Sequence, residues 1–166
     1  MAESELGQMI KAGFAEYRRI FDYRGRSNRT QFWAFAVINI GLAQVAMAVP
    51  MMIGFAQGDP HAVFDYAIGG FLAMLLFAIP YFAAITRRLH DSGRTGWWVL
   101  PQAILLGTGL AGFMKIFGAL AIDDGLFALM FLNNIIYLGW VALLIFFAVL
   151  PGDEGSNRFG DPVAYP

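Results

Sequence analysis

Three short segments of the chain hold most of the side chains that could bind an anion or move a proton. Ten of their residues are candidate site residues: Arg26, Arg29, Arg87, Arg88, His90, Asp91, Arg94, Trp97, Asn157 and Arg158. Arginine forms bidentate hydrogen bonds with carboxylates and phosphates, and histidine exchanges protons near neutral pH. These residue types suggest an internal charge network, contact with anionic phospholipid headgroups, or a site for a soluble anionic ligand.

The elements that must position these residues are membrane spans. Of the 166 residues, 58% are hydrophobic and 14% are charged, against about 45–50% and 25% in soluble domains. A bilayer core of about 30 Å needs roughly 20 apolar residues of helix, and four stretches qualify: 33–56, 66–86, 97–122 and 126–150. We predict an all-α integral membrane protein with four transmembrane helices. The net charge of −1 gives no general attraction to nucleic acid, so we expect no such partner.

Lysine and arginine in the loops predict how the chain is threaded. Ten of the eleven basic residues lie in 1–32, 87–96 and 151–166, and the other is Lys115. Because short cytoplasmic loops are enriched in Lys and Arg, we expect both termini and the middle loop in the cytoplasm. The chain then divides into a cytoplasmic segment (1–32), a four-helix bundle (33–150) and a cytoplasmic tail (151–166).

The segment before the first span has the pattern of an amphipathic helix. Apolar residues recur at steps of three and four: Leu6, Met9, Ile10, Phe14, Tyr17, Ile20 and Phe21. Such a helix ahead of a span favours a position along the cytoplasmic interface, and the alternative is packing against the protein's own loops. The chain starts Met-Ala-Glu-Ser-Glu with no basic region, and the first apolar run starts only after residue 32, so we expect the chain to be inserted whole.

Polar residues and prolines inside the spans predict helix contacts and bends. We expect Asn39, Gln44, Asn133 and Asn134 to hydrogen-bond between helices rather than line a pore, and Pro50 and Pro80 to kink their spans. Asn28 precedes the first span with Gln31 three residues later, which predicts a capping box.

Catalysis and metal binding are less well supported than anion recognition. His90 and Asp91 are adjacent in sequence, which does not by itself bring their side chains together, and no Ser or Cys nucleophile motif accompanies them. The chain has no Cys and two His, and the second, His61, lies in a loop on the opposite side of the membrane. We therefore favour a protein that is not an enzyme, and expect no metal and no cofactor.

Three motifs carry a resemblance to a known family. Residues 25–33 read Gly-Arg-Ser-Asn-Arg-Thr-Gln-Phe-Trp, residues 87–98 begin Arg-Arg-Leu-His-Asp and end Gly-Arg-Thr-Gly-Trp-Trp, and residues 151–160 read Pro-Gly-Asp-Glu-Gly-Ser-Asn-Arg-Phe-Gly. In this order and spacing, over about residues 15–162, they resemble domain of unknown function 805. Gln31 stands where that family often has an acidic residue, and a proline common after the last motif is missing. The resemblance implies a small bacterial inner-membrane protein with four spans, and it implies no activity.

We call these three segments (25–33, 87–98 and 151–160) the cap, because the predicted threading brings all of them to the cytoplasmic face. The favoured hypothesis is a structural or accessory membrane component whose cap engages anionic phospholipid or a membrane partner protein. The alternatives are an oligomeric small-solute or ion conduit, and a membrane enzyme that acts on a phosphorylated lipid through His90 and Asp91. A homo-oligomer is compatible with each.

Overall fold

A computed structural model describes residues 4–118 and 123–163, and within these ranges the chain is helical with no strand. The helices follow the order α1 (Glu5–Ala15), η1 (Glu16–Arg19), α2 (Arg29–Ala56), α3 (Pro60–Leu76), α4 (Ala78–Asp91), η2 (Gly96–Val99), α5 (Leu100–Gly118) and α6 (Asp124–Val149), where η marks a 3₁₀ helix. Residues 119–122, where the third predicted span ends, lie outside the described residues.

Four helical stretches are long and apolar enough to cross a membrane: Arg29–Ala56, Asp65–Asp91, Gly96–Ile116 and Asp124–Val149. With α1 ahead of them, they confirm the predicted fold class. The predicted capping box is also confirmed, because the Asn28 side chain accepts from the Gln31 backbone and the Gln31 side chain accepts from the Asn28 backbone.

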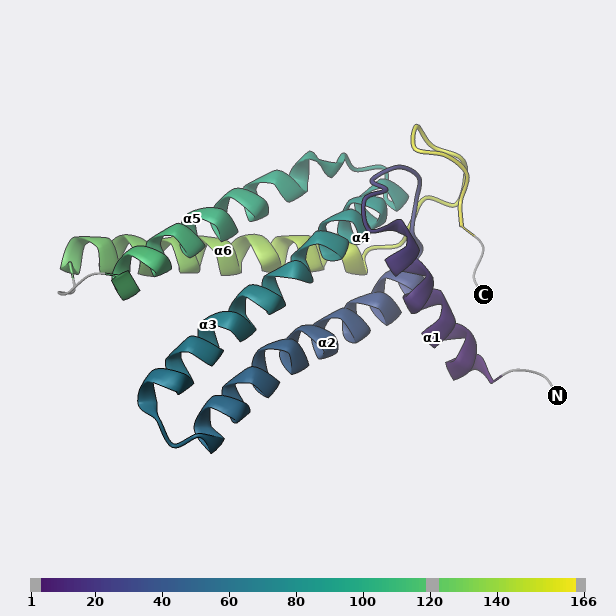
Figure 1. The fold of residues 1–166 in the computed structure, drawn as a ribbon. Helices are drawn as coiled ribbons and strands as arrows, with labels where there is room; N and C mark the ends of the chain where they lie inside the picture. The colour runs from purple at the N-terminus through teal and green to yellow at the C-terminus, as the bar shows by residue number, and fades with distance from the viewer. Residues whose placement is uncertain (1–3, 119–122, 164–166) are drawn as a thin grey trace.

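The four stretches form two helical hairpins that meet at the cap and diverge away from it (Figure 1). One hairpin is α2 with α3, and the other is α5 with α6. We call their far ends the tips: residues 57–59 in the first hairpin, and the end of α5 with the start of α6 in the second. The two hairpins touch where the rings of Phe71 on α3 and Phe113 on α5 lie 5.4 Å apart. The described chain begins and ends at the cap end (Figure 1).

The second stretch is broken near its middle. Helix α3 ends at Leu76 and α4 begins at Ala78, close to Pro80, which has no N–H to continue the helical ladder. The side-chain amide of Asn39 on α2 donates to the backbone oxygen of Phe77 at 3.1 Å, and it accepts from the Tyr17 hydroxyl at 3.0 Å. At Pro50, by contrast, α2 continues without interruption.

The other intramembrane amides behave differently from one another. Asn133 on α6 accepts from the Thr108 hydroxyl and donates to the Leu105 backbone oxygen, both on α5, so it joins two helices. Asn134 donates to Met130 within its own helix, and Gln44 is exposed on the outer surface. The prediction of contacts between helices therefore holds for Asn39 and Asn133.

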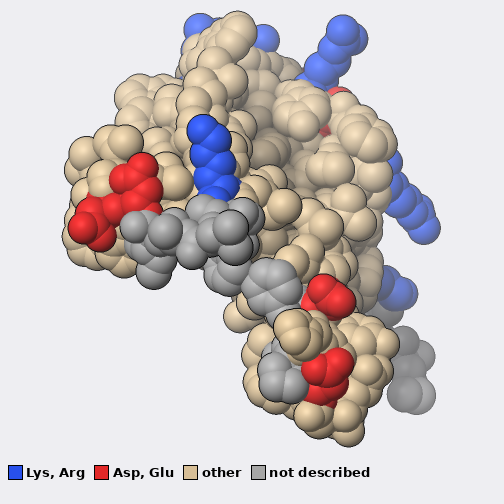
Figure 2. Space-filling model, turned by 60° about the vertical axis from the view of Figure 1, so that its left-hand side comes forward, with Lys and Arg blue, Asp and Glu red and all other residues tan. Residues whose placement is uncertain are grey.

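The apolar core lies directly beneath the cap. It is formed by Phe32, Phe35, Ala36, Ala84, Ile85, Leu89, Val99, Leu144 and Ala148. Away from the cap the hairpins expose large apolar side chains, among them Val37, Leu129 and Leu138, as expected for surfaces that face lipid tails. Figure 2 shows acidic groups gathered on both tips and most Lys and Arg away from them.

Helix α1 crosses the cap end of the bundle at a steep angle to α2 (Figure 1). Gly13 permits the contact, since a methyl group there would lie 2.9 Å from the Ala34 carbonyl carbon and 3.0 Å from the Phe35 nitrogen. Leu6 and Phe14 remain exposed. Thus α1 packs against a span rather than only on loops, and keeps an apolar surface uncovered.

Candidate functional site

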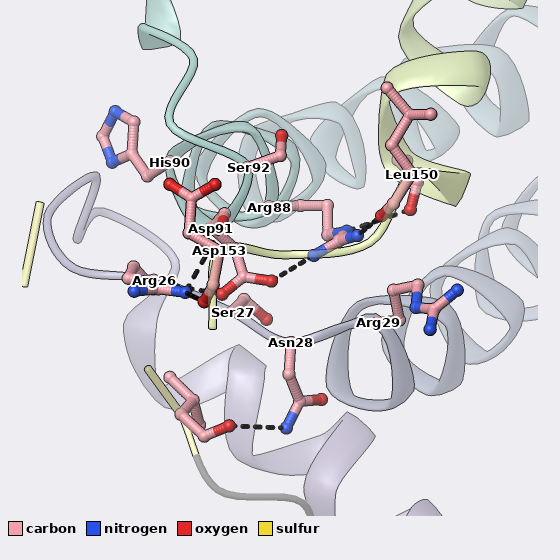
Figure 3. Close-up of polar contacts among 12 residues, drawn as sticks. Arg26, Ser27, Asn28, Arg29, Arg88, His90, Asp91, Ser92, Leu150 and Asp153 are labelled. Atoms are coloured by element: carbon pink, nitrogen blue, oxygen red, sulfur yellow. Dashed lines mark hydrogen bonds and ion pairs between the residues drawn. The ribbon is translucent and has the colours of Figure 1, made fainter. Parts of the chain in front are cut away.

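The last turn of α4 is the centre of the cap. Arg87, Arg88, His90 and Asp91 are all buried, at 0%, 0%, 8% and 4% exposure. Helix C-termini favour cationic side chains because the backbone dipole is negative there. Successive helical positions point about 100° apart, so this turn sends side chains toward different neighbouring elements, as Figure 3 shows for Arg88, His90 and Asp91.

Asp91 bridges two arginines. Its Oδ1 accepts from Arg26 Nε at 2.9 Å, and its Oδ2 pairs with Arg88 Nη1. Arg26 is 3% exposed, and its remaining N–H groups donate to backbone oxygens of residues 91, 153, 155 and 160. A buried charge is tolerated when it is paired and its hydrogen bonds are made. Arg26 therefore fastens all three segments of the cap together.

Arg88 closes the end of α6. Its Nε donates to the Ala148 oxygen at 2.9 Å, and its Nη2 donates to the Leu150 oxygen. The last carbonyls of a helix have no partner within that helix, so a guanidinium placed there satisfies them. The chain then passes close to Asp91 at Gly152, where a methyl group would lie 2.7 Å from Cγ of Asp91.

Arg87 contacts the segment before the first span, at residues 16–22, rather than Asp91 or the end of α6. It pairs with Glu16 and donates to the backbone oxygens of Arg19 and Asp22. Glu16 is 4% exposed, and its second oxygen accepts from the Ser27 hydroxyl at 3.0 Å. Arg87 Nε has no hydrogen-bond partner among the described residues.

Asp22, whose backbone oxygen accepts from Arg87, has a partly exposed side chain. The Arg24 backbone N–H donates to its carboxylate, and the Arg19 guanidinium pairs with it at 2.8 Å. These contacts, the backbone N–H first, hold the pKa of Asp22 below its ordinary value despite the opposing effect of burial.

The third segment folds over the end of α4. The Asp153 N–H donates to the Asp91 oxygen at 2.7 Å, and the Asn157 amide donates to the His90 oxygen at 3.0 Å. Arg158 is exposed, donates to the Gly93 oxygen at 3.1 Å, and lies over the ring of Phe159.

The structure divides the ten candidate residues into two groups. The first is turned inward: Arg26, Arg87, Arg88, His90 and Asp91 are buried, with Asn157 partly so. The second reaches the surface: Arg29, Trp97 and Arg158 are exposed, and Arg94 is half-buried over the ring of Phe147. Figure 3 shows Arg29 directed away from the Arg26–Asp91–Arg88 group.

A cavity of about 620 Å³ lies beside His90. The His90 ring stacks on Phe159 with centroids 3.8 Å apart, and its Nδ1 lies 3.1 Å from the Gly25 oxygen. Figure 3 shows the ring turned away from the ion pairs, so His90 and Asp91 do not form a catalytic pair. Among the described residues, no three His, Cys, Asp or Glu side chains gather to hold a metal ion.

The sequence reasoning missed Glu16 as the anion for Arg87. A signal was present, because Glu16 lies three residues after Gly13 and four before Ile20, on the face that packs inward. The carbonyl partners of Arg88 had no such signal, since every residue carries a carbonyl.

Comparisons with known proteins place the chain among inner-membrane proteins. The model of the family described as protein of unknown function (DUF805) matches residues 20–161. The inner membrane protein YhaH of Escherichia coli K12 is 28% identical over 145 residues, which are 87% of this chain and 89% of the relative. YhaI of the same organism is 27% identical over 139 residues, 84% and 83% of the two chains. No solved structure matches.

The family match covers most of the chain, so this protein belongs to the DUF805 family. The resemblance read from the three motifs is thereby confirmed, together with the description as a helical membrane protein.

Proposed function

We propose that this DUF805 protein is a non-enzymatic accessory component of the bacterial inner membrane whose cap engages anionic phospholipid headgroups. The proposal includes the threading predicted from the basic residues, with the cap and both termini on the cytoplasmic side. That leaflet carries the negative surface potential that attracts juxtamembrane cations.

One observation carries this proposal: the cations of the cap end are divided between buried and exposed side chains. The guanidiniums of Arg26, Arg87 and Arg88 are directed at the protein's own carboxylates and carbonyls. Other cations at the same end are exposed, namely Arg18, Arg24, Arg29 and Arg158. Each juxtamembrane cation contributes about 1 kcal/mol near an anionic leaflet, so four contribute about 4 kcal/mol.

The uncovered apolar surface of α1 supports the same proposal. Leu6 and Phe14 are 65% and 52% exposed, beside the exposed Lys11 and Arg18. Exposed apolar side chains next to basic ones are typical of helices that lie in the headgroup region. A helix that crosses the cap end can place this surface in that region.

The test measures preference for anionic lipid in nanodiscs of equal parts phosphatidylglycerol and phosphatidylcholine. Native mass spectrometry gives the ratio of the two lipids carried by the released protein. The double substitution Arg24→Gln with Arg29→Gln removes two exposed cations, worth about 2 kcal/mol or roughly thirtyfold in preference. Lys115→Gln removes one exposed cation near a tip and is the control for charge alone; we expect it to change the ratio less than the double variant does.

Two results would overturn the proposal. One is a wild-type protein that carries the two lipids in the proportion supplied. The other is a loss of phosphatidylglycerol in Lys115→Gln equal to that in the double variant, because the preference would then not depend on cations at the cap end.

A further inference from the structure

The cavity beside His90 is built at the boundary between the cap and the membrane spans. Its walls come from α4, η2, the start of α5, the third cap segment, and Tyr23 in the loop before the first cap segment. Its volume of about 620 Å³ is within the range of about 300–1,000 Å³ found for ligand sites. Phe82 and His90, both in its wall, are eight residues apart on α4, which is about 12 Å along a helix.

The two ends of the cavity differ in chemistry. One wall is apolar and belongs to the spans, with Phe82, Val99, Leu100 and Ala103. The wall at the cap holds the polar groups of Thr95, His90 and Arg158. A cavity that is apolar toward the membrane and cationic toward the headgroups matches an amphiphile with an anionic head.

Arg158 provides the positive charge. It is exposed, its planar group lies 4.7 Å from the Phe159 ring centroid, and one nitrogen donates to the Gly93 oxygen. These two contacts fix the guanidinium while its other N–H groups keep their capacity to bind a phosphate.

His90 provides a complementary acceptor. Its Nδ1 faces a carbonyl oxygen, which only accepts, so the neutral ring carries its proton on Nδ1 and leaves a lone pair on Nε2. Nε2 makes no hydrogen bond among the described residues, and it lies beside Gly96 in the cavity wall, 3.5 Å from where a methyl group on that glycine would be. A headgroup hydroxyl can donate to this nitrogen.

We propose that this cavity binds one anionic glycerophospholipid, with its phosphate on Arg158, a headgroup hydroxyl on Nε2 of His90, and the upper part of an acyl chain along Phe82 and Ala103. The site deepens the proposed function and rests on it for the presence of the headgroup layer at the cap. It differs from the exposed cations in holding a single molecule with defined contacts.

The experiment counts the phospholipid molecules that stay bound on gentle activation of the intact protein, released from the same phosphatidylglycerol–phosphatidylcholine nanodiscs. Wild type retains one phosphatidylglycerol. Arg158→Gln removes a charge-assisted hydrogen bond and weakens that retention about ten- to a hundredfold. Ala103→Phe fills the apolar end without changing charge, and it also removes the retained lipid.

Arg29→Gln is the matched control, since it removes an exposed cation at the cap end that does not line the cavity. It lowers the overall preference for anionic lipid and keeps the one retained molecule. Retention by both Arg158→Gln and Ala103→Phe at the wild-type level would overturn the cavity proposal, while the Arg24 and Arg29 double variant still tests the proposed function separately.

Two further ligands test which part of the lipid the cavity recognises. Phosphatidylmethanol has the phosphate but no headgroup hydroxyl, so we expect it to be retained more weakly; equal retention would overturn the role of His90. Inorganic phosphate lacks the acyl chains, so we expect it not to displace the retained lipid. Displacement by phosphate alone would overturn the lipid assignment in favour of a soluble anion site.

Discussion

The most informative substitution in the cap is Gly152→Ala. A methyl group at Gly152 would lie 2.7 Å from Cγ of Asp91 and closer to one of its oxygens. That carboxylate is held from two sides by Arg26 and Arg88, so it cannot move aside without breaking an ion pair. The third cap segment must therefore lift away from α4.

The expected cost follows from these contacts. Overpacking a closely fitted site costs about 1–3 kcal/mol, and loss of one charge-assisted hydrogen bond costs about 1.5–3 kcal/mol. Because lifting the segment relieves part of the overlap, we expect a net loss of about 2–4 kcal/mol in the docking of residues 151–160. That corresponds to a rise of roughly thirtyfold to almost a thousandfold in the population of the open segment.

The assay is limited proteolysis by trypsin, which cleaves after Arg158, in inside-out membrane vesicles that present the predicted cytoplasmic face. When opening and closing are fast relative to cleavage, the cleavage rate follows the open population. Gly155→Ala is the control, since no atom lies within 4 Å of a methyl group there and its φ is not positive. Equal cleavage rates for Gly152→Ala and Gly155→Ala would refute the argument that the Asp91 carboxylate fixes this segment.

Three further outcomes are expected. Gly70→Ala places a methyl group 2.8 Å from the Met47 backbone oxygen, so we expect it to weaken the α2–α3 packing and destabilise the fold by about 1–3 kcal/mol, measured by thermal unfolding in detergent. The control is Gly69→Ala, whose methyl group meets no atom within 4 Å, so its thermal stability should be unchanged or improved. Asn39→Leu lowers unfolding free energy in bicelles by about 1–2 kcal/mol, since two hydrogen bonds are lost; an unchanged value would contradict their role. The pKa of Asp22 is lowered in the folded state, so its carboxylate stabilises the fold above the unfolded pKa of about 4, and this stabilisation is lost as pH falls through the folded pKa. In Asp22→Asn we expect the free energy of unfolding to fall less on acidification than in wild type, by under about 1 kcal/mol. An identical pH profile of unfolding would contradict this.

The spans could be predicted because composition alone decides them. A run of about 20 apolar residues has few stable alternatives to a membrane helix, and all four stretches contain helices long and apolar enough to cross. Pro80 also marked the neighbourhood of the break between α3 and α4, because the missing N–H is a local property.

The division of the arginines could not be predicted from residue types. Arg26 and Arg29 lie in one motif, but α2 begins at Arg29, so that side chain leaves the helix at the surface, while Arg26 lies in the preceding loop over the end of α4. The burial of Arg26 depends on hydrogen bonds to the backbone oxygens of residues far along the chain. Backbone acceptors carry no signal in a sequence, so pairing of this kind appears only in three dimensions.

The contacts of Arg26 also set an order for biosynthesis. Its partners lie between 65 and 134 residues further along the chain. At about 5–20 residues per second, the ribosome takes about 7–27 s to travel the longer of these distances. During that interval the hairpins can insert, but Arg26 lacks the carbonyl partners that the third cap segment supplies. The cap can therefore close fully only after the third cap segment has been synthesised.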